Sequence, residues 1–264
     1  MRATSPGALR RKLFAIALLS IAALLAVAAM SPIPQPERYH DFADQRTVLG
    51  VPHALNVVSS VGFLIVGVVG LRRLSKLGAS FTDARERWPY TVFFASVVAV
   101  GFGSIHYHLA PSHGSLFWDR LPMSLAFMSL LSAVLVERLG PRVGLRLFPW
   151  LEAAGPISVV YWMWSERAGV GDLRLYGLVH FYPMLLMPLL LWLFAPRYTR
   201  GGDLLWVLAL YMTALAAERL DHQVFAAGGW ISGHTLKHML AAVAAAWLLR
   251  MLRLRSPAAA ESAP

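Results

Sequence analysis

Two stretches of the chain carry serine, histidine and aspartate at the edges of long apolar runs. In the first, Ser104 and His108 are four residues apart, and Asp119 follows at the start of the next apolar run. In the second, His234 and His238 are also four residues apart. Because residues four apart share one face of a helix, each pair can project from its helix toward a common point. Polar groups at the edges of apolar helices are costly, which indicates a function for them.

Three imidazoles from two helices could hold a zinc ion and leave a fourth position for water, which is the layout of a catalytic zinc site. His108, His234 and His238 are the predicted ligands. Zinc lowers the pKa of its water to about 7 and polarises a carbonyl group. Asp119 could accept the proton of that water and pass it to a leaving group. Ser104 could hydrogen-bond the developing oxyanion; with no histidine left to activate it, we expect a stabiliser rather than a nucleophile.

The same residues allow other interpretations. Two histidines four residues apart can simply hydrogen-bond the backbone or lipid headgroups, and a proton relay through histidines and carboxylates is the main rival to zinc. His106 and His113 show that histidine is common in this region. His106 is two residues from His108 and points elsewhere on a helix, so we expect it to be structural.

The composition is that of a polytopic membrane protein. Of the 264 residues, 57% are hydrophobic and only 14% are charged, whereas a soluble domain is about half apolar and a quarter charged. The absence of cysteine excludes disulfides, thiolate metal sites and cysteine nucleophiles. The formal net charge is +10, but the basic residues lie between hydrophobic runs. The bilayer, and not nucleic acid, is therefore the expected partner.

The apolar runs predict an all-α membrane bundle with a seven-transmembrane core plus an extra N-terminal hydrophobic helix. The first run, 13–30, reaches about 27 Å as a helix and can just span a bilayer. It also resembles a signal peptide, but we favour a retained helix because the run is longer than a usual signal core. The seven further spans are predicted at 49–71, 89–110, 115–136, 146–164, 175–195, 203–225 and 232–252.

Three regions follow from this pattern. Residues 1–30 form a basic flank and the N-terminal membrane helix or signal sequence, residues 31–252 form the seven-helix domain, and residues 253–264 form an Ala/Pro/Ser-rich tail that is expected to be disordered.

The lysines and arginines are unequally divided between the two sides of these spans. The terminal side holds 17 of the 24, which places both termini in the cytoplasm and the candidate site toward the outer half of the membrane. The opposite side holds Arg38, Arg46, Arg120, Arg167, Arg174, Arg219 and Lys237.

The order of these site residues resembles the alkaline ceramidase family. Ser104-x3-His108, Asp119 eleven residues later, and a late His234-x3-His238 are similar to that family's pattern. The segments 41–46 and 220–225, together with Asn56 and Ser59, also resemble it, and the similarity covers about residues 39–250. The family belongs to a wider superfamily of seven-helix metal-dependent hydrolases that includes the adiponectin-type receptors.

The resemblance implies a zinc-dependent amidase that hydrolyses ceramide to a sphingoid base and a fatty acid. It also implies His108, His234 and His238 as zinc ligands, with Ser104 and Asp119 as the catalytic polar pair. The composition is rich in Ala, Leu and Arg and poor in Lys, which indicates a bacterial cell membrane, where another N-acyl lipid could replace ceramide. A non-catalytic lipid-binding receptor and a proton-coupled transporter are the alternative functions.

Eukaryotic ceramidases carry a calcium site in their acidic segment, and Asp41, Asp44 and the Phe42 carbonyl could supply oxygen ligands here. Arg46, however, stands where an oxygen-bearing residue would be expected, and calcium takes six to eight oxygens. Calcium is therefore disfavoured, and the alternative is that the aspartates cap a helix or pair with nearby arginines.

Two acidic residues lie shortly before the second histidine pair. Asp221 and Glu218 could orient a histidine ligand from the outer coordination shell. Equally, Glu218 could pair with Arg219 or His222 at the membrane interface.

Overall fold

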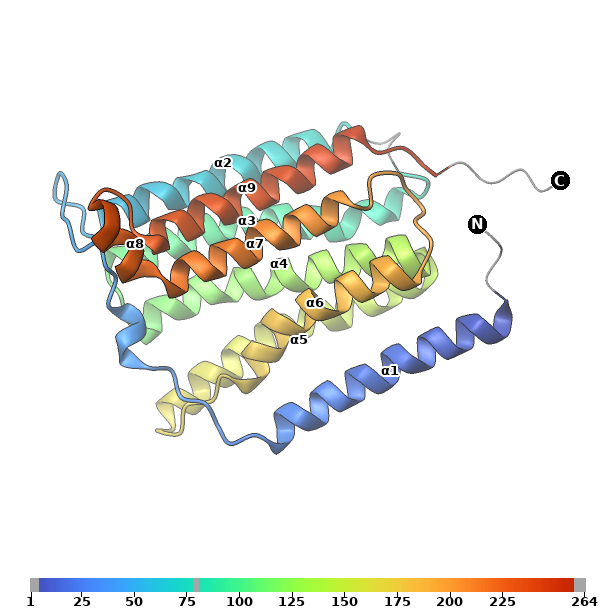
Figure 1. The fold of residues 1–264 in the computed structure, drawn as a ribbon, viewed down its shortest axis with the longest axis horizontal. Helices are drawn as coiled ribbons and strands as arrows, with labels where there is room; N and C mark the ends of the chain where they lie inside the picture. The colour runs from blue at the N-terminus through green and yellow to red at the C-terminus, as the bar shows by residue number, and fades with distance from the viewer. Residues whose placement is uncertain (1–4, 78–80, 259–264) are drawn as a thin grey trace.

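The computed structural model describes residues 5–77 and 81–258, and within these ranges the chain is all-α, with no β-sheet. The described residues form nine α-helices, connected by loops that include two single 3₁₀ turns, η1 (Glu37–His40) and η3 (Ala84–Glu86) (Figure 1). The helices are α1 (Pro6–Ala29), α2 (Ala54–Leu74), α3 (Arg87–Leu109), α4 (His113–Leu139), α5 (Pro141–Arg167), α6 (Arg174–Leu193), α7 (Asp203–Arg219), α8 (Asp221–Gly228) and α9 (Gly233–Leu254).

Six of these helices are long and apolar enough to cross a membrane: α1, α2, α3 with its preceding turn, α4, α6 and α9. They identify the chain as an integral multi-pass membrane protein, as its composition predicts. The other two predicted spans are also helical. Helix α7 has only 17 residues, and α5 contains Glu152 and two internal prolines, yet both lie alongside the long helices of the bundle (Figure 1).

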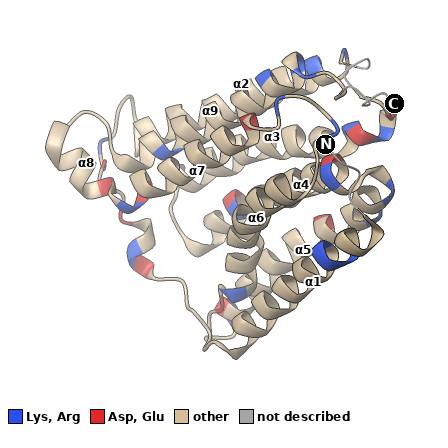
Figure 2. Cartoon of the chain, turned by 45° about the vertical axis from the view of Figure 1, so that its right-hand side comes forward, with Lys and Arg blue, Asp and Glu red and all other residues tan. Residues whose placement is uncertain are grey.

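Consecutive long helices run in opposite directions, so that the start of α1 and the end of α9 lie at one end of the bundle (Figure 1). The opposite end carries η1, α8 and the loop that leads into α2. Helix α4 is the most buried of the candidate spans and packs between α3 and α5, while α9 packs between α2 and α7. Figure 2 shows lysines and arginines gathered near the two termini, with fewer at the far end.

Local capping explains where the site-bearing helices begin. Ser112 and Ser115 form a reciprocal capping box that starts α4, and Ser232 accepts a hydrogen bond from the Thr235 amide at the start of α9. Gly140, at a φ of +91°, ends α4, and Pro141 then starts α5. These caps place the first turns of α4 and α9 at the same end of the bundle as the last turn of α3.

The predicted span 203–225 differs from the structure, which breaks it at Leu220 into α7 and the short α8. The break has a tertiary cause. The Asp221 carboxylate accepts hydrogen bonds from the backbone amides of Ala43 and His234, which holds it at a junction of three segments. Gly233 lies against the Ala217 carbonyl, where a Cβ would overlap the backbone.

The expected disordered tail also differs in its first part. Helix α9 continues to Leu254, and Arg255 is buried in an ion pair with Glu137. The backbone of 256–258 then pairs with that of 197–199. The remainder of the predicted tail, 259–264, and the first four residues of the basic flank lie outside the described residues.

Candidate metal centre

The structure brings the three predicted histidine ligands together. One ligand atom from each of His108, His234 and His238 lies within 4.8 Å of the other two, and all three side chains are buried. His108 comes from the last turn of α3, and the other two come from the first turns of α9. This group could hold a metal ion.

The spacing of the ring nitrogens fits metal coordination. The Nε2 atoms of His108 and His238 are 3.3 Å apart. Two nitrogens bound at 2.0–2.1 Å to a tetrahedral ion lie about 3.4 Å from each other, so one ion could bind both. Three imidazoles in a chain without cysteine form a donor set that suits zinc as well as copper, iron or nickel.

The outer side of the His238 ring is held by α2. Its Nδ1 lies 3.0 Å from the Ser59 hydroxyl, 3.2 Å from the Asn56 carbonyl and 3.3 Å from the Ser60 hydroxyl. Asn56 also accepts a hydrogen bond from Thr235 on α9 through its side-chain oxygen. With Nδ1 occupied in this way, Nε2 is directed at the cluster, which is how outer-shell partners orient a metal-bound histidine.

Ser104 and Asp119 lie beside the histidines, where α3 and α4 approach most closely. Both are buried and line the same cavity as His238, and the Ser104 hydroxyl is 3.0 Å from the Ser60 hydroxyl. The approach depends on Gly103, because a Cβ there would overlap the Trp118 carbonyl. The structure therefore groups all five residues that the sequence pattern singles out.

The two acidic residues before α9 act differently from one another. Asp221 bonds to backbone amides and not to an imidazole. Glu218 faces the His234 ring, with an oxygen 3.9 Å from Nδ1, and it also accepts hydrogen bonds from Lys237 (2.5 Å) and the Tyr39 hydroxyl (3.0 Å). The alternative pairing of Glu218 with Arg219 or His222 is not the arrangement found.

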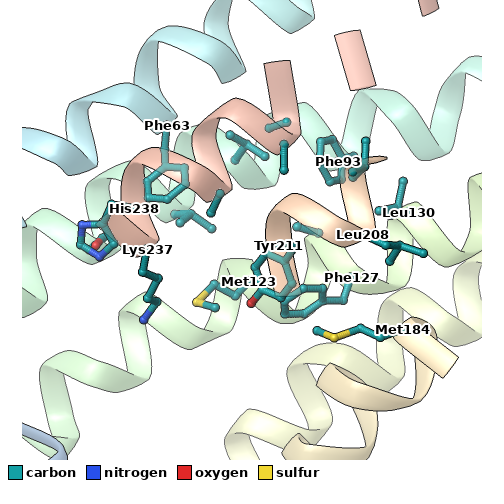
Figure 3. Close-up of a pocket in the computed structure, with 18 of the residues that line it drawn as sticks. Phe63, Phe93, Met123, Phe127, Leu130, Met184, Leu208, Tyr211, Lys237 and His238 are labelled. Atoms are coloured by element: carbon teal, nitrogen blue, oxygen red, sulfur yellow. The ribbon is translucent and has the colours of Figure 1, made fainter. Parts of the chain in front are cut away.

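Lys237 was not among the predicted site residues. It is buried, its ammonium group pairs with Glu218, and its side chain lines the same cavity as His238 (Figure 3). A lysine within an apolar membrane helix is a signal for a functional residue and could have pointed to it. Ser60 was missed as well, because a serine in an apolar helix has too many ordinary explanations to stand out.

The acidic segment of the 31–48 loop covers the histidines, and two of its three candidate calcium ligands, Asp44 and the Phe42 carbonyl, have other partners. Asp44 forms an ion pair with Arg46 at 2.7 Å, which lowers the pKa of Asp44, while the Asp41 side chain is 66% exposed. The Phe42 carbonyl accepts a hydrogen bond from the Gln45 side chain. The Phe42 ring is buried, with its centre 4.7 Å from those of His108 and His234. The pairing of Asp44 with a nearby arginine is thus the alternative that the structure contains.

A long cavity opens from this polar end into the bundle (Figure 3). The cavity has a volume of about 110 Å³. Its polar lining is Ser104, Asp119, Lys237 and His238 at one end and the Tyr211 hydroxyl farther along. The apolar lining comes from α2, α3, α4, α6, α7 and α9: Phe63, Phe93, Val97, Val100, Met123, Ala126, Phe127, Leu130, Met184, Met187, Val207, Leu208, Ala241, Ala244 and Ala245.

The length of this cavity can be measured along α3 and α4, which run antiparallel, and the two values agree. On α3 its lining runs back from Ser104 to Phe93, and on α4 it runs forward from Asp119 to Leu130. Each interval is eleven residues, or about 16 Å at 1.5 Å per residue. Figure 3 shows His238 and Lys237 at one end and Phe93 and Leu130 toward the other. The cavity is therefore elongated along the helix axes.

Comparison of the chain with protein-family models and with curated proteins finds no match.

Proposed function

We propose that this protein is a zinc-dependent amidohydrolase that cleaves the amide bond of ceramide or a related N-acyl lipid within the membrane. The products are a sphingoid base or another amine and a free fatty acid. One observation supports the proposal above all others: the three-histidine cluster lies at the polar end of an elongated apolar cavity. A lipid amide has the same division, with a polar reacting group at the end of an apolar chain.

The side chains around the cluster have suitable positions for hydrolysis. His108, His234 and His238 would hold the zinc ion, which supplies an acidified water and a Lewis acid when it is bound. Asp119 takes the proton from the attacking water and returns it to the amide nitrogen as the C–N bond breaks. Ser104 donates a hydrogen bond to the carbonyl oxygen as negative charge develops on it. The water oxygen remains on the acyl carbon, which leaves as the fatty acid.

The apolar cavity would hold the acyl chain. Its walls are mostly aliphatic and aromatic side chains from six helices, and its length of about 16 Å matches an extended fatty-acyl chain better than a compact ligand. Burial of the chain contributes affinity in proportion to the apolar area removed from water. The carbonyl group of a chain lying in the cavity would be next to Ser104 and His238.

We infer that the bundle has a seven-transmembrane core preceded by α1, with both termini in the cytoplasm. The alternation of the helix directions and the gathering of lysine and arginine near the termini support this orientation (Figure 2). The metal centre then lies in the outer half of the membrane. A bacterial cell membrane is the proposed location, on the basis of the amino-acid composition.

The test is release of fatty acid by purified protein from a short-chain fluorescent ceramide and from a panel of other N-acyl amines, with zinc measured in the same samples. Wild type should release fatty acid, and His108→Ala should lose both activity and zinc. His106→Ala is the matched control, because His106 is exposed on the same helix. A zinc-loaded wild type that hydrolyses none of these substrates would refute the proposed reaction and favour a lipid-binding receptor. A wild type that binds no zinc would favour a proton relay.

A further inference from the structure

A second cluster of metal-capable side chains lies outside the three-histidine group. One ligand atom each from Glu37, His40 and His113 lies within 4.8 Å of the other two. Glu37 and His40 are three residues apart on the 3₁₀ turn η1, where residues at that spacing lie on the same side. His113 is the first residue of α4. The cluster thus joins the loop before α2 to the start of α4.

One ring nitrogen of each histidine in this cluster has no partner among the described protein groups. The Nε2 atoms of His40 and His113 are both enclosed and have no hydrogen-bond partner among the described residues. The two rings meet edge to face, with their centres 4.9 Å apart. An enclosed polar atom without a partner costs free energy, and such atoms are uncommon in proteins. Two of them in adjacent rings are available to bind a ligand.

The outer contact of the His40 ring suits coordination. His40 Nδ1 lies 2.8 Å from the hydroxyl of buried Tyr107. Glu37 Oε1 lies 3.4 Å from His113 Nδ1, which places the carboxylate within the cluster. If Nδ1–H of His40 donates to Tyr107, its Nε2 carries a free lone pair. Metal-bound histidines are oriented by a partner of this kind on the other ring nitrogen.

We propose that Glu37, His40 and His113 form a second metal site, separate from the three-histidine group, that binds a divalent transition metal such as zinc. Two imidazoles and one carboxylate are a recurrent donor set for this class of ion. The Glu37 side chain is 85% exposed, so this site faces water, whereas the three-histidine group is buried. The second site therefore exchanges metal with the medium more readily than the first.

Occupancy of the second site would restrain the cover of the first. His40 is two residues before Phe42, whose ring packs on His108 and His234. A metal ion that joins η1 to α4 fixes the segment that carries Phe42. Binding of metal at the second site would thus stabilise the segment that covers the first site.

The experiment uses the full chain in detergent, stripped of metal by a chelator and dialysed against Zn²⁺ alone. Wild type should bind two zinc ions per chain, and both Glu37→Gln and His113→Gln should lose the weaker-binding ion or weaken it at least tenfold. Glu37 is so exposed that its substitution should not disturb folding. His106→Gln, an exposed histidine on α3, should still bind two. A His113→Gln protein that binds as many zinc ions as wild type, with the same affinities, would overturn the second site.

The two metal sites can be tested separately. His108→Ala should lose the buried ion and keep the exposed one, so failure of the proposed hydrolase site leaves the second site intact. Limited trypsin digestion tests the effect on the cover, because Arg38 is exposed within η1. Zn²⁺ should slow cleavage at Arg38 several-fold in wild type and not in His113→Gln. Equal cleavage rates with and without Zn²⁺ in wild type would overturn the role in restraining the cover.

Discussion

The Nε2 atoms of His108 and His238 lie 3.3 Å apart, although the two residues are 130 positions apart in the chain. The contact depends on a third helix, because Asn56 and Ser59 on α2 hold the far side of the His238 ring. It also depends on the close packing of α3 against α4 at Gly103. The arrangement of the three histidines therefore depends on the packing of several helices, and disturbances of that packing should change it.

Gly103→Ala should damage the centre without changing any polar group. The added methyl group would overlap the Trp118 carbonyl and force α3 away from α4, at a cost of about 1–3 kcal/mol. The unfolding temperature and the zinc content would measure the effect, and both should be lower than in wild type. Gly177→Ala is the matched control, because a Cβ there meets no neighbouring atom, and it should leave both unchanged. Equal behaviour of the two variants would contradict the packing argument.

Asp119→Asn should keep the metal and lose turnover. Asparagine has nearly the same shape as aspartate but cannot accept and return a proton, and a positioned acid–base group contributes about 10²–10⁴-fold to a rate. Hydrolysis of the fluorescent substrate and zinc content should be measured on the same sample. Joint loss of zinc and activity would instead assign Asp119 to holding the metal centre together.

Ala245→Phe should change the preferred acyl length. Ala245 lines the apolar part of the cavity, so a phenyl ring there would fill the space that the end of a long chain needs. We expect kcat/KM for long-chain substrates to fall at least tenfold relative to short-chain ones. Ala246→Phe is the control, since Ala246 is exposed on the same helix and should leave the ratio unchanged. An unchanged ratio in both variants would place the acyl chain outside this cavity.

The loop between α5 and α6 predicts a pH effect on stability. Asp172 is buried and pairs with Arg174 at 2.8 Å, and this partner lowers the pKa of Asp172 to about 2 from 3.8. Because the pKa is lower in the folded state, the pair stabilises the protein above about pH 4, and this contribution is lost as the pH falls through 2. Asp172→Asn should therefore lower the unfolding temperature at pH 7, and the difference from wild type should shrink toward pH 2.

Asp83 provides the comparison for that measurement. It also pairs with an arginine two residues later, Arg85, but the arginine side chain is 70% exposed. Exposed ion pairs contribute little to stability. Asp83→Asn should accordingly leave the unfolding temperature nearly unchanged at pH 7, and a loss as large as that of Asp172→Asn would contradict the role of burial.

Much of the fold could be predicted because a membrane helix is encoded locally. The apolar runs anticipated a helix in each of the eight long segments, and the all-α architecture is confirmed. The spacing of four residues in Ser104–His108 and His234–His238 placed each pair on one helix face. Local periodicity cannot show which helices are neighbours. That His108 and the pair His234–His238 lie close together was predicted only from their similar depth in the membrane, and the structure brings these histidines together.

The features that were missed depend on contacts between distant segments. The break at Leu220 is caused by Asp221, whose carboxylate accepts hydrogen bonds from the backbone amides of Ala43 and His234. Ala43 is far away in the sequence, and His234 lies beyond the turn that follows α8. The ion pair of Lys237 with Glu218 joins α9 to α7, and its importance follows only from its burial. The cluster of Glu37 and His40 with His113 likewise requires a loop and a helix to meet in space. No window of neighbouring residues contains this information.

Helix α1 differs from every other long helix in having no buried residue. Its polar links to the bundle are few, among them the Ser20 hydroxyl on that of Tyr182 and the Lys12 ammonium on the Leu193 carbonyl. Its side chains therefore need to be apolar enough to lie in lipid, but they do not need a particular shape to fit against the other helices. Rearranging the order of the apolar residues in α1 should leave the protein folded, whereas the same rearrangement in α4 should abolish folding. Evolutionary drift along this chain should be correspondingly fast in its first thirty residues and slow at its centre.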